Sequence, residues 1–152
     1  MSLKQLLDQN RIIHHKTSKQ EISNLFELIR RDLNDAKIIQ LSADRRFATA
    51  YNAALQLGTI LLYCKGYKTK GRGHHFFIFQ AMKEILDKEH HSLADYFDSC
   101  RAKRNISDYT GAGNVSDAEV DEIIKEVESF YDFVISWLKK NYPGLINEKN
   151  NL

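Results

Sequence analysis

Two arginines, Arg101 and Arg104, stand where the apolar face of a predicted helix ends. Apolar residues precede them at three- and four-residue intervals, the spacing of one helix face: these are Leu93, Tyr96, Phe97 and Cys100. Arg104 continues this spacing, which directs a guanidinium towards the protein interior. Because a buried charge is costly unless it is compensated, we predict a partner for Arg104. A carboxylate, such as Asp108 one helical turn on, a second subunit and a phosphate are the three candidates.

The residues after these arginines add groups that suit nucleic acid. Asn105 offers an amide to a base or ribose, and Tyr109 offers an aromatic face. Cations beside such groups bind phosphates and stack bases in sites for single-stranded nucleic acid. The same cations can stabilise the charge that develops when a phosphodiester is cleaved, provided that a histidine is near to act as acid or base.

A glycine-containing basic loop over residues 66–73, with two histidines after it, is the second source of such groups. The side chains concerned are Lys68, Lys70, Arg72, His74 and His75. In an up-and-down bundle this loop and the segment 101–114 fall at the same end of the molecule. We therefore predict one basic surface made from both segments. The alternative is a solvated loop whose charges serve solubility.

Long helices dominate the predicted elements that position these groups. Ser18, Ser92 and Ser116 each precede an acidic residue by three positions, the pattern of a helix N-cap. Apolar periodicity predicts a short helix around residues 3–7 and longer ones over about 18–40, 44–65, 74–88, 93–109 and 116–141. We expect no strand. The predicted fold is all-α, an up-and-down antiparallel bundle of four to five helices in a single domain, 1–152, with its core at about 18–141 and a polar tail over 147–152.

Composition limits the functional classes. The 152 residues are 43% hydrophobic and 28% charged, as in a soluble globular protein, and a net charge of +2 means that any anion-binding surface must be local. No apolar run approaches the ~20 residues of a membrane span, and no signal-peptide pattern is present, so we expect a cytoplasmic protein without membrane contact. Two cysteines and three adjacent histidine pairs lack metal-ligand spacing. We therefore expect neither a metal nor a cofactor.

The segments LSADRRFATAYNAA at 41–54 and GRGHH at 71–75, followed by Arg104-Asn105, resemble the HEPN domain family, with bacterial stand-alone members the most similar. The resemblance covers about residues 18–141. It implies an all-α, usually dimeric bundle. Many members are metal-independent ribonucleases of toxin–antitoxin, phage-defence and RNA-processing systems, and others are inactive partners of small nucleotidyltransferases.

The active motif of that family is an arginine, commonly a polar residue, and then a histidine after four to six intervening residues. Arg104 and Asn105 match its first half, whereas Tyr109, Thr110 and Gly111 stand where the histidine would be. A phenol, with an ordinary pKa of about 10, is a poor general base at neutral pH. The motif is therefore degenerate, which favours binding over catalysis.

The resulting expectation is a cytoplasmic homodimer that binds RNA or a nucleotide in a toxin–antitoxin or defence-type system. Arg104 would hold phosphate, Asn105 would bond base or ribose, and Tyr109 would stack or donate. In family dimers the motif arginines face one another across a cleft, so we expect Tyr96 and Phe97 to form a dimer seam. The alternatives are an active metal-independent ribonuclease that uses His74 or His75, and a non-catalytic partner of a nucleotidyltransferase or antitoxin.

Overall fold

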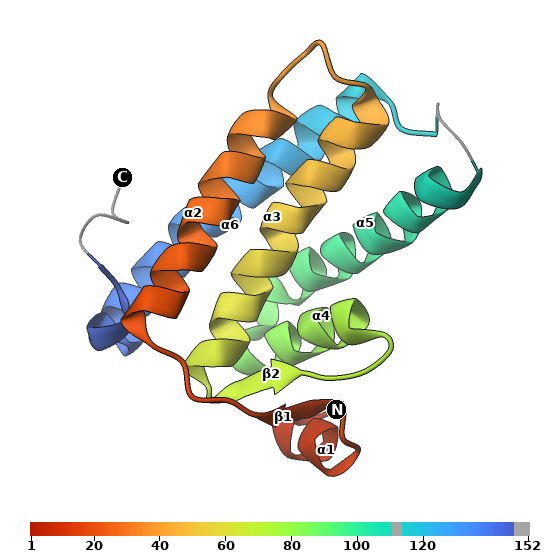
Figure 1. Cartoon of the computed structure of the whole chain (residues 1–152). Coiled ribbons are helices and arrows are strands. Elements are labelled where there is room, and N and C mark those ends of the chain that lie inside the picture. Colours follow the sequence, from red (N-terminus) through yellow and green to blue (C-terminus); the bar gives the residue numbers. More distant parts are fainter. Residues whose placement is uncertain (111–113, 148–152) are drawn as a thin grey trace.

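Four long helices form the body of the molecule in the computed structural model, which describes the backbone of residues 1–110 and 114–147 and the side chains of 1–105 and 114–147 (Figure 1). In chain order the elements are α1 (Leu3–Asp8), β1 (Ile12–His14), α2 (Lys19–Ala36), α3 (Ala43–Cys64), β2 (Tyr67–Thr69), α4 (His74–Ile85), the 3-10 helix η1 (Lys88–His90), α5 (His91–Thr110), α6 (Asp117–Asn141) and the 3-10 helix η2 (Pro143–Leu145). The predicted all-α bundle is confirmed. No helix in the described ranges combines the length and apolarity needed to cross a membrane.

Serine caps begin most of the long helices. The hydroxyls of Ser18, Ser42 and Ser116 each accept a hydrogen bond from the backbone amide three residues on, and Glu119 completes a capping box with Ser116. The cap predicted at Ser92 is wrong, because α5 begins at His91, directly after η1. Since η1 already turns the chain into α5, Ser92 lies within the first helical turn.

The helix α3 is the centre of the core and contacts α2, α4, α5 and α6. Tyr51, Ala54 and Leu57 on α3 are fully buried, and so is Phe97 on α5. The Phe97 ring lies between Phe79 and Phe130, with ring centroids 5.9 and 5.6 Å away. The prediction that Phe97 forms a dimer seam is therefore wrong, because this side chain is already covered within one chain.

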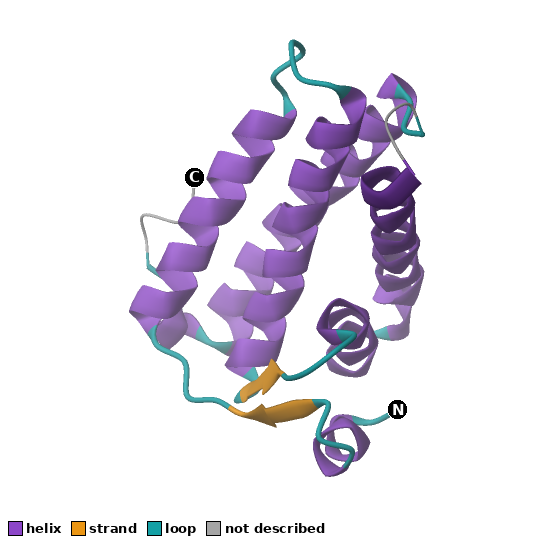
Figure 2. Cartoon of the chain, turned by 45° about the vertical axis from the view of Figure 1, so that its right-hand side comes forward, coloured by secondary structure: helices purple, strands orange, loops and turns teal. Residues whose placement is uncertain are grey.

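The short helix α4 crosses the bundle instead of running along it. Figure 2 shows α4 end-on while α2 and α3 run across the view. Gly58 of α3 permits this crossing: a Cβ added there would lie 2.6 Å from Cγ2 of Ile78 on α4. The absence of a side chain at Gly58 therefore brings the start of α4, with its two histidines, close to α3.

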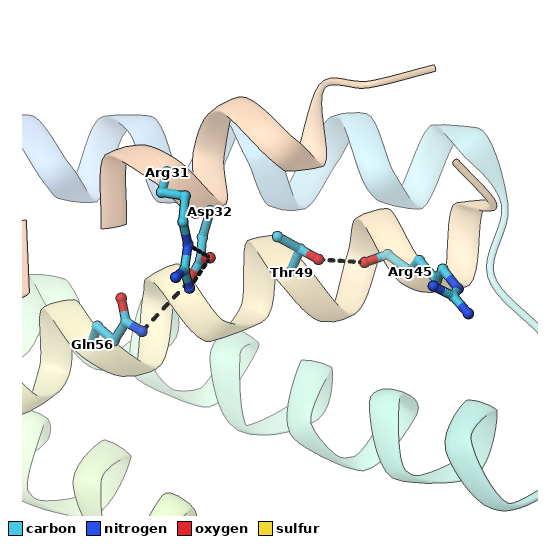
Figure 3. A network of polar contacts seen from close by, with 5 residues as sticks. All are labelled: Arg31, Asp32, Arg45, Thr49 and Gln56. Carbon is cyan, nitrogen blue, oxygen red and sulfur yellow. Dashed lines mark hydrogen bonds and ion pairs between the residues drawn. The ribbon is translucent and has the colours of Figure 1, made fainter. Parts of the chain in front are cut away.

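Polar contacts tie α2 to α3 (Figure 3). Asp32 on α2 is only 4% exposed, and its Oδ1 accepts hydrogen bonds from Nε and Nη2 of Arg31 at 3.2 and 2.9 Å. Its other oxygen, Oδ2, lies 3.5 Å from Nε2 of Gln56 on α3. Arg46, in the first turns of α3, is also buried. Its Nε donates a hydrogen bond to the Ala36 carbonyl at the end of α2, at 2.8 Å.

Two short strands contradict the expectation that no strand is present. The strands β1 and β2 pair antiparallel, with Ile12 opposite Thr69, and fix the first half of the 66–73 loop against the N-terminal segment. Leu6 and Ile12 are fully buried and pack in a second small apolar cluster with Phe77 of α4. In three residues a strand offers no alternating pattern to detect, which is why the sequence did not predict it.

Candidate functional site

Tyr51 of α3 joins the two groups that the sequence predicted separately. The Cζ atom of Arg104 on α5 lies 5.4 Å from the centroid of the Tyr51 ring. On the same ring, the hydroxyl oxygen lies 3.1 Å from Nδ1 of His75 on α4. Three helices therefore contribute to one cluster of a guanidinium, a phenol and an imidazole. We call Tyr51, His74, His75, Arg101 and Arg104 the arginine–histidine cluster.

The start of α4 positions the two histidines. Gly73 precedes the helix with φ of 74°, in the left-handed region that glycine adopts without strain, and no side chain caps the first turn. His74 is exposed and His75 is half-buried. Their rings lie 4.2 Å apart, edge to face. The glycine turn thus places one imidazole at the surface and one against Tyr51.

Burial and positive neighbours keep His75 neutral. Desolvation, together with repulsion from His74, Arg104 and Arg101, lowers the pKa of His75 from 6.5 to about 4. Desolvation raises the pKa of Tyr51 although the two arginines oppose that shift. At neutral pH the phenol is therefore protonated and can donate to Nδ1, which leaves the proton of the imidazole on Nε2.

The cations along α5 have different surroundings. Arg101 pairs with Asp98, with 2.8 Å between Nε and Oδ1, and its Cζ lies 5.8 Å from the Phe76 ring centroid. Lys103 pairs with Glu119 of α6 at 2.5 Å. Arg104 rests on the aromatic face of Tyr51, which attracts a cation through the ring quadrupole. As the apolar stripe predicted, the Arg104 side chain turns inward.

The other predicted site residues are distributed more widely. Asn105 is exposed on α5, one residue after Arg104. The side chains of Asp108, Tyr109 and Thr110, and all of Gly111, lie outside the described residues, so the roles expected for Tyr109 and for an Arg104–Asp108 pair stay predictions.

The basic surface predicted from the whole loop 66–73 is wrong for its first half. Lys68 belongs to β2, near Glu21 of α2. Against desolvation, hydrogen bonds from His15 and Thr17 lower the pKa of Glu21, and the Lys68 charge adds to this effect. The Lys70 amide donates to the Arg11 carbonyl at 2.9 Å. Figure 1 shows β2 at one end of the bundle and the C-terminal end of α5 at the other. Because α4 crosses the bundle, only the C-terminal end of the 66–73 loop lies near α5. Arg72, at this end of the loop, is exposed.

Cysteine chemistry does not contribute to this region. Burial raises the pKa of Cys100 to about 11 and that of Cys64 to about 12, so both thiols are protonated and weakly nucleophilic at neutral pH. Among the described side chains, no group of three or more histidine, cysteine, aspartate or glutamate residues is placed to hold a metal ion. The chemistry available in the arginine–histidine cluster is that of cations, a neutral imidazole and a phenol.

No protein-family model matches this sequence, and the comparisons with curated proteins and with solved structures found no match. Membership of the HEPN family therefore stays a prediction, which depends on the segments 41–54 and 71–75 and on Arg104-Asn105.

One residue of the cluster, Tyr51, was missed as a functional candidate because its helix periodicity is that of a core residue. A signal did exist: a phenol in the middle of an otherwise apolar helix requires a hydrogen-bond partner. A second indication of a functional role was that Tyr51 lies beside the polar residue Asn52 in the 41–54 segment, one of the segments that carry the family resemblance.

Proposed function

We propose that this chain is a HEPN-like, homodimeric module that binds single-stranded RNA or a nucleotide at the arginine–histidine cluster. One observation carries the proposal: the Arg104 guanidinium and the His75 imidazole, from different helices, meet on the same tyrosine ring. A guanidinium held on an aromatic face is already oriented, so it loses little conformational freedom when it binds a phosphate. The neutral His75 can donate from Nε2, and the exposed Asn105 can bond a base or ribose.

The family resemblance supports a homodimer and a toxin–antitoxin or defence role, with an antitoxin or nucleotidyltransferase as possible partner. Since Phe97 is internal, it cannot belong to the proposed dimer seam, whereas Tyr96 is half-buried and its part in a seam stays a prediction. Sedimentation of the pure protein tests the dimer part of the proposal. A monomer at concentrations well above those needed for RNA binding would contradict it.

RNA binding can be measured by fluorescence anisotropy with a short single-stranded oligonucleotide. We expect Arg104→Ala to weaken binding by about tenfold or more. It should also reduce the salt dependence, because each lost phosphate contact to a single strand lowers the slope of log binding constant against log salt concentration by about 0.7. Arg45→Ala is the matched control, since Arg45 is exposed on α3 outside the cluster. Equal weakening by both variants would show general charge attraction and would overturn the proposed site.

A second candidate, metal-independent ribonuclease activity, is favoured by the proximity of His74 and His75. In this reaction one imidazole takes the proton of the ribose 2′-hydroxyl, whose oxygen attacks the adjacent phosphorus. The bond to the 5′-oxygen breaks, and that oxygen takes a proton from an acid. The products are a 2′,3′-cyclic phosphate and a 5′-hydroxyl. The exposed His74 suits the base, because His75 already accepts from Tyr51 at Nδ1 and carries its proton on Nε2, and Arg104 suits the developing charge on phosphate.

Cleavage of RNA by pure protein in the presence of a chelator separates the two candidates. Loss of cleavage in Arg104→Ala, His74→Ala and His75→Ala alike would support the ribonuclease. Intact RNA together with salt-sensitive binding would support the binding module. If neither binding nor cleavage occurs, both candidates are wrong. The remaining hypothesis is then that the arginines serve an interface with a partner protein.

A further inference from the structure

A cavity of about 470 Å³ opens where α3, α4 and α6 end, at the same end of the bundle as β2. It has no part in the arginine–histidine cluster. Its volume falls within the range of cavities that bind small molecules, about 300–1,000 Å³. The lining combines aromatic rings with charged residues of both signs, which limits the chemistry of a ligand.

Flat aromatic side chains form the inner wall of the cavity. Phe133 and Trp137 lie one helical turn apart on α6, and both are half-buried. The His90 ring packs on Phe133 with centroids 4.2 Å apart, and the Tyr142 ring lies 5.3 Å from the Trp137 ring. Leu86, at the end of α4, adds an aliphatic surface. Such a wall favours a planar ring, which stacks on the aromatic faces and removes apolar surface from water.

The charged residues around this wall balance one another. Lys65 and Lys140 contribute two positive charges, and Asp87 and Glu89 contribute two negative charges. In the described part of the chain, none of Lys65, Lys140 and Asp87 forms an ion pair, and Glu89 Oε1 lies 4.0 Å from Nδ1 of His90. The Nζ atom of Lys65 also lies 5.7 Å from the centroid of the Tyr142 ring. Two cations and two anions together match a ligand that carries one charge of each sign, and they oppose a phosphate dianion.

We propose that this cavity binds a small aromatic zwitterion, of the chemical class of the aromatic amino acids. The ring stacks against Phe133 and Trp137. The carboxylate meets Lys65 and Lys140 on one side, and the ammonium group meets Asp87 and Glu89 on the other. This site is independent of the proposed RNA site.

The chain contains its own reporter for this proposal, because Trp137 is the only tryptophan. L-phenylalanine is the probe, with excitation at the red edge of tryptophan absorption, where phenylalanine does not absorb. We expect a saturable change in Trp137 fluorescence. Phenethylamine, which lacks the carboxylate, and hydrocinnamate, which lacks the ammonium group, should each bind about tenfold more weakly. Leucine should have no effect at the same concentrations.

Substitutions at adjacent lysines provide the matched control. Lys140→Gln should weaken phenylalanine binding by about five- to tenfold, whereas Lys139→Gln, one residue away and outside the cavity lining, should leave it unchanged. Equal thermal unfolding of both variants establishes that their folds are intact. No saturable response to phenylalanine, equal binding of all three aromatic probes, tighter binding of AMP, or equal effects of the two lysine variants would each overturn the proposal. Arg104→Ala should bind phenylalanine normally, so failure of the RNA site and failure of this site are separable.

Discussion

Replacing His75 by glutamine is expected to reduce the acid sensitivity of the fold. In the native protein His75 has a pKa lowered from 6.5 to about 4. In the unfolded chain it protonates near its ordinary value. Between these pH values the unfolded state binds more protons than the native state, so acidification favours unfolding. The stability that His75 contributes as a neutral side chain is therefore fully present above about pH 6.5 and is lost as the pH falls towards 4.

The magnitude follows from the size of the pKa change. At about 1.4 kcal/mol for each pH unit, a pKa of about 4 sets an upper limit of about 3 kcal/mol on the stability lost at low pH. Because the ring is only half-buried, solvent screening reduces this figure to about 1–2 kcal/mol. Glutamine retains a polar side chain of similar reach but has no proton to gain.

Urea unfolding at pH 7 and at pH 4.5 measures the effect. The stability difference between the native protein and His75→Gln should shrink by about 1–2 kcal/mol on going to the lower pH. His74→Gln is the control, because it makes the same replacement at the exposed neighbour, and an equal change in both variants would assign the effect to loss of a histidine in general. An unchanged difference for His75→Gln, or a His75 ring resonance that titrates near pH 6.5, would refute the burial argument for the cluster.

Three substitutions test the packing that positions the cluster. Gly58→Ala should destabilise the protein by about 1–3 kcal/mol despite its better helix propensity, because the new methyl group meets Ile78; increased stability in a denaturant titration would show that α4 yields easily. Phe97→Ala should cost about 3–5 kcal/mol, since the ring is fully buried within one chain, and a stable variant that differs only in sedimentation would restore the dimer-seam interpretation. Ser116→Ala should cost about 1 kcal/mol through loss of the capping box, whereas an unchanged midpoint of thermal unfolding would mean that the cap is dispensable.

The long helices were predictable because local signals agree with tertiary packing. In α6 the capping box at Ser116 and a continuous apolar stripe specify both the start and the buried face. The predicted helix ends were less accurate. The structure ends α2 at Ala36 instead of about residue 40, and it ends α4 at Ile85 instead of about residue 88. Helix ends depend on contacts with other elements, such as the bond from Arg46 to the Ala36 carbonyl, which no local pattern contains.

The candidate site was predictable only in part. The apolar stripe correctly indicated that Arg104 turns inward, because helix periodicity fixes the direction of a side chain. It could not say what Arg104 meets, since Tyr51 lies far away in the sequence. The predicted grouping of Lys68 with α5 failed for a related reason. Up-and-down topology assumes that each helix follows the bundle axis, and α4 crosses it at Gly58.

The most direct test of the central claim is an NMR titration of the protein with a short single-stranded RNA. The account predicts that the side-chain Nε–H resonance of Arg104 and the ring resonances of His75 shift together and saturate at one RNA concentration. In Arg104→Lys the His75 shifts should weaken markedly, because lysine lacks the planar fork that binds phosphate. RNA-dependent shifts that leave both Arg104 and His75 unchanged would contradict the assignment of this cluster as the binding site.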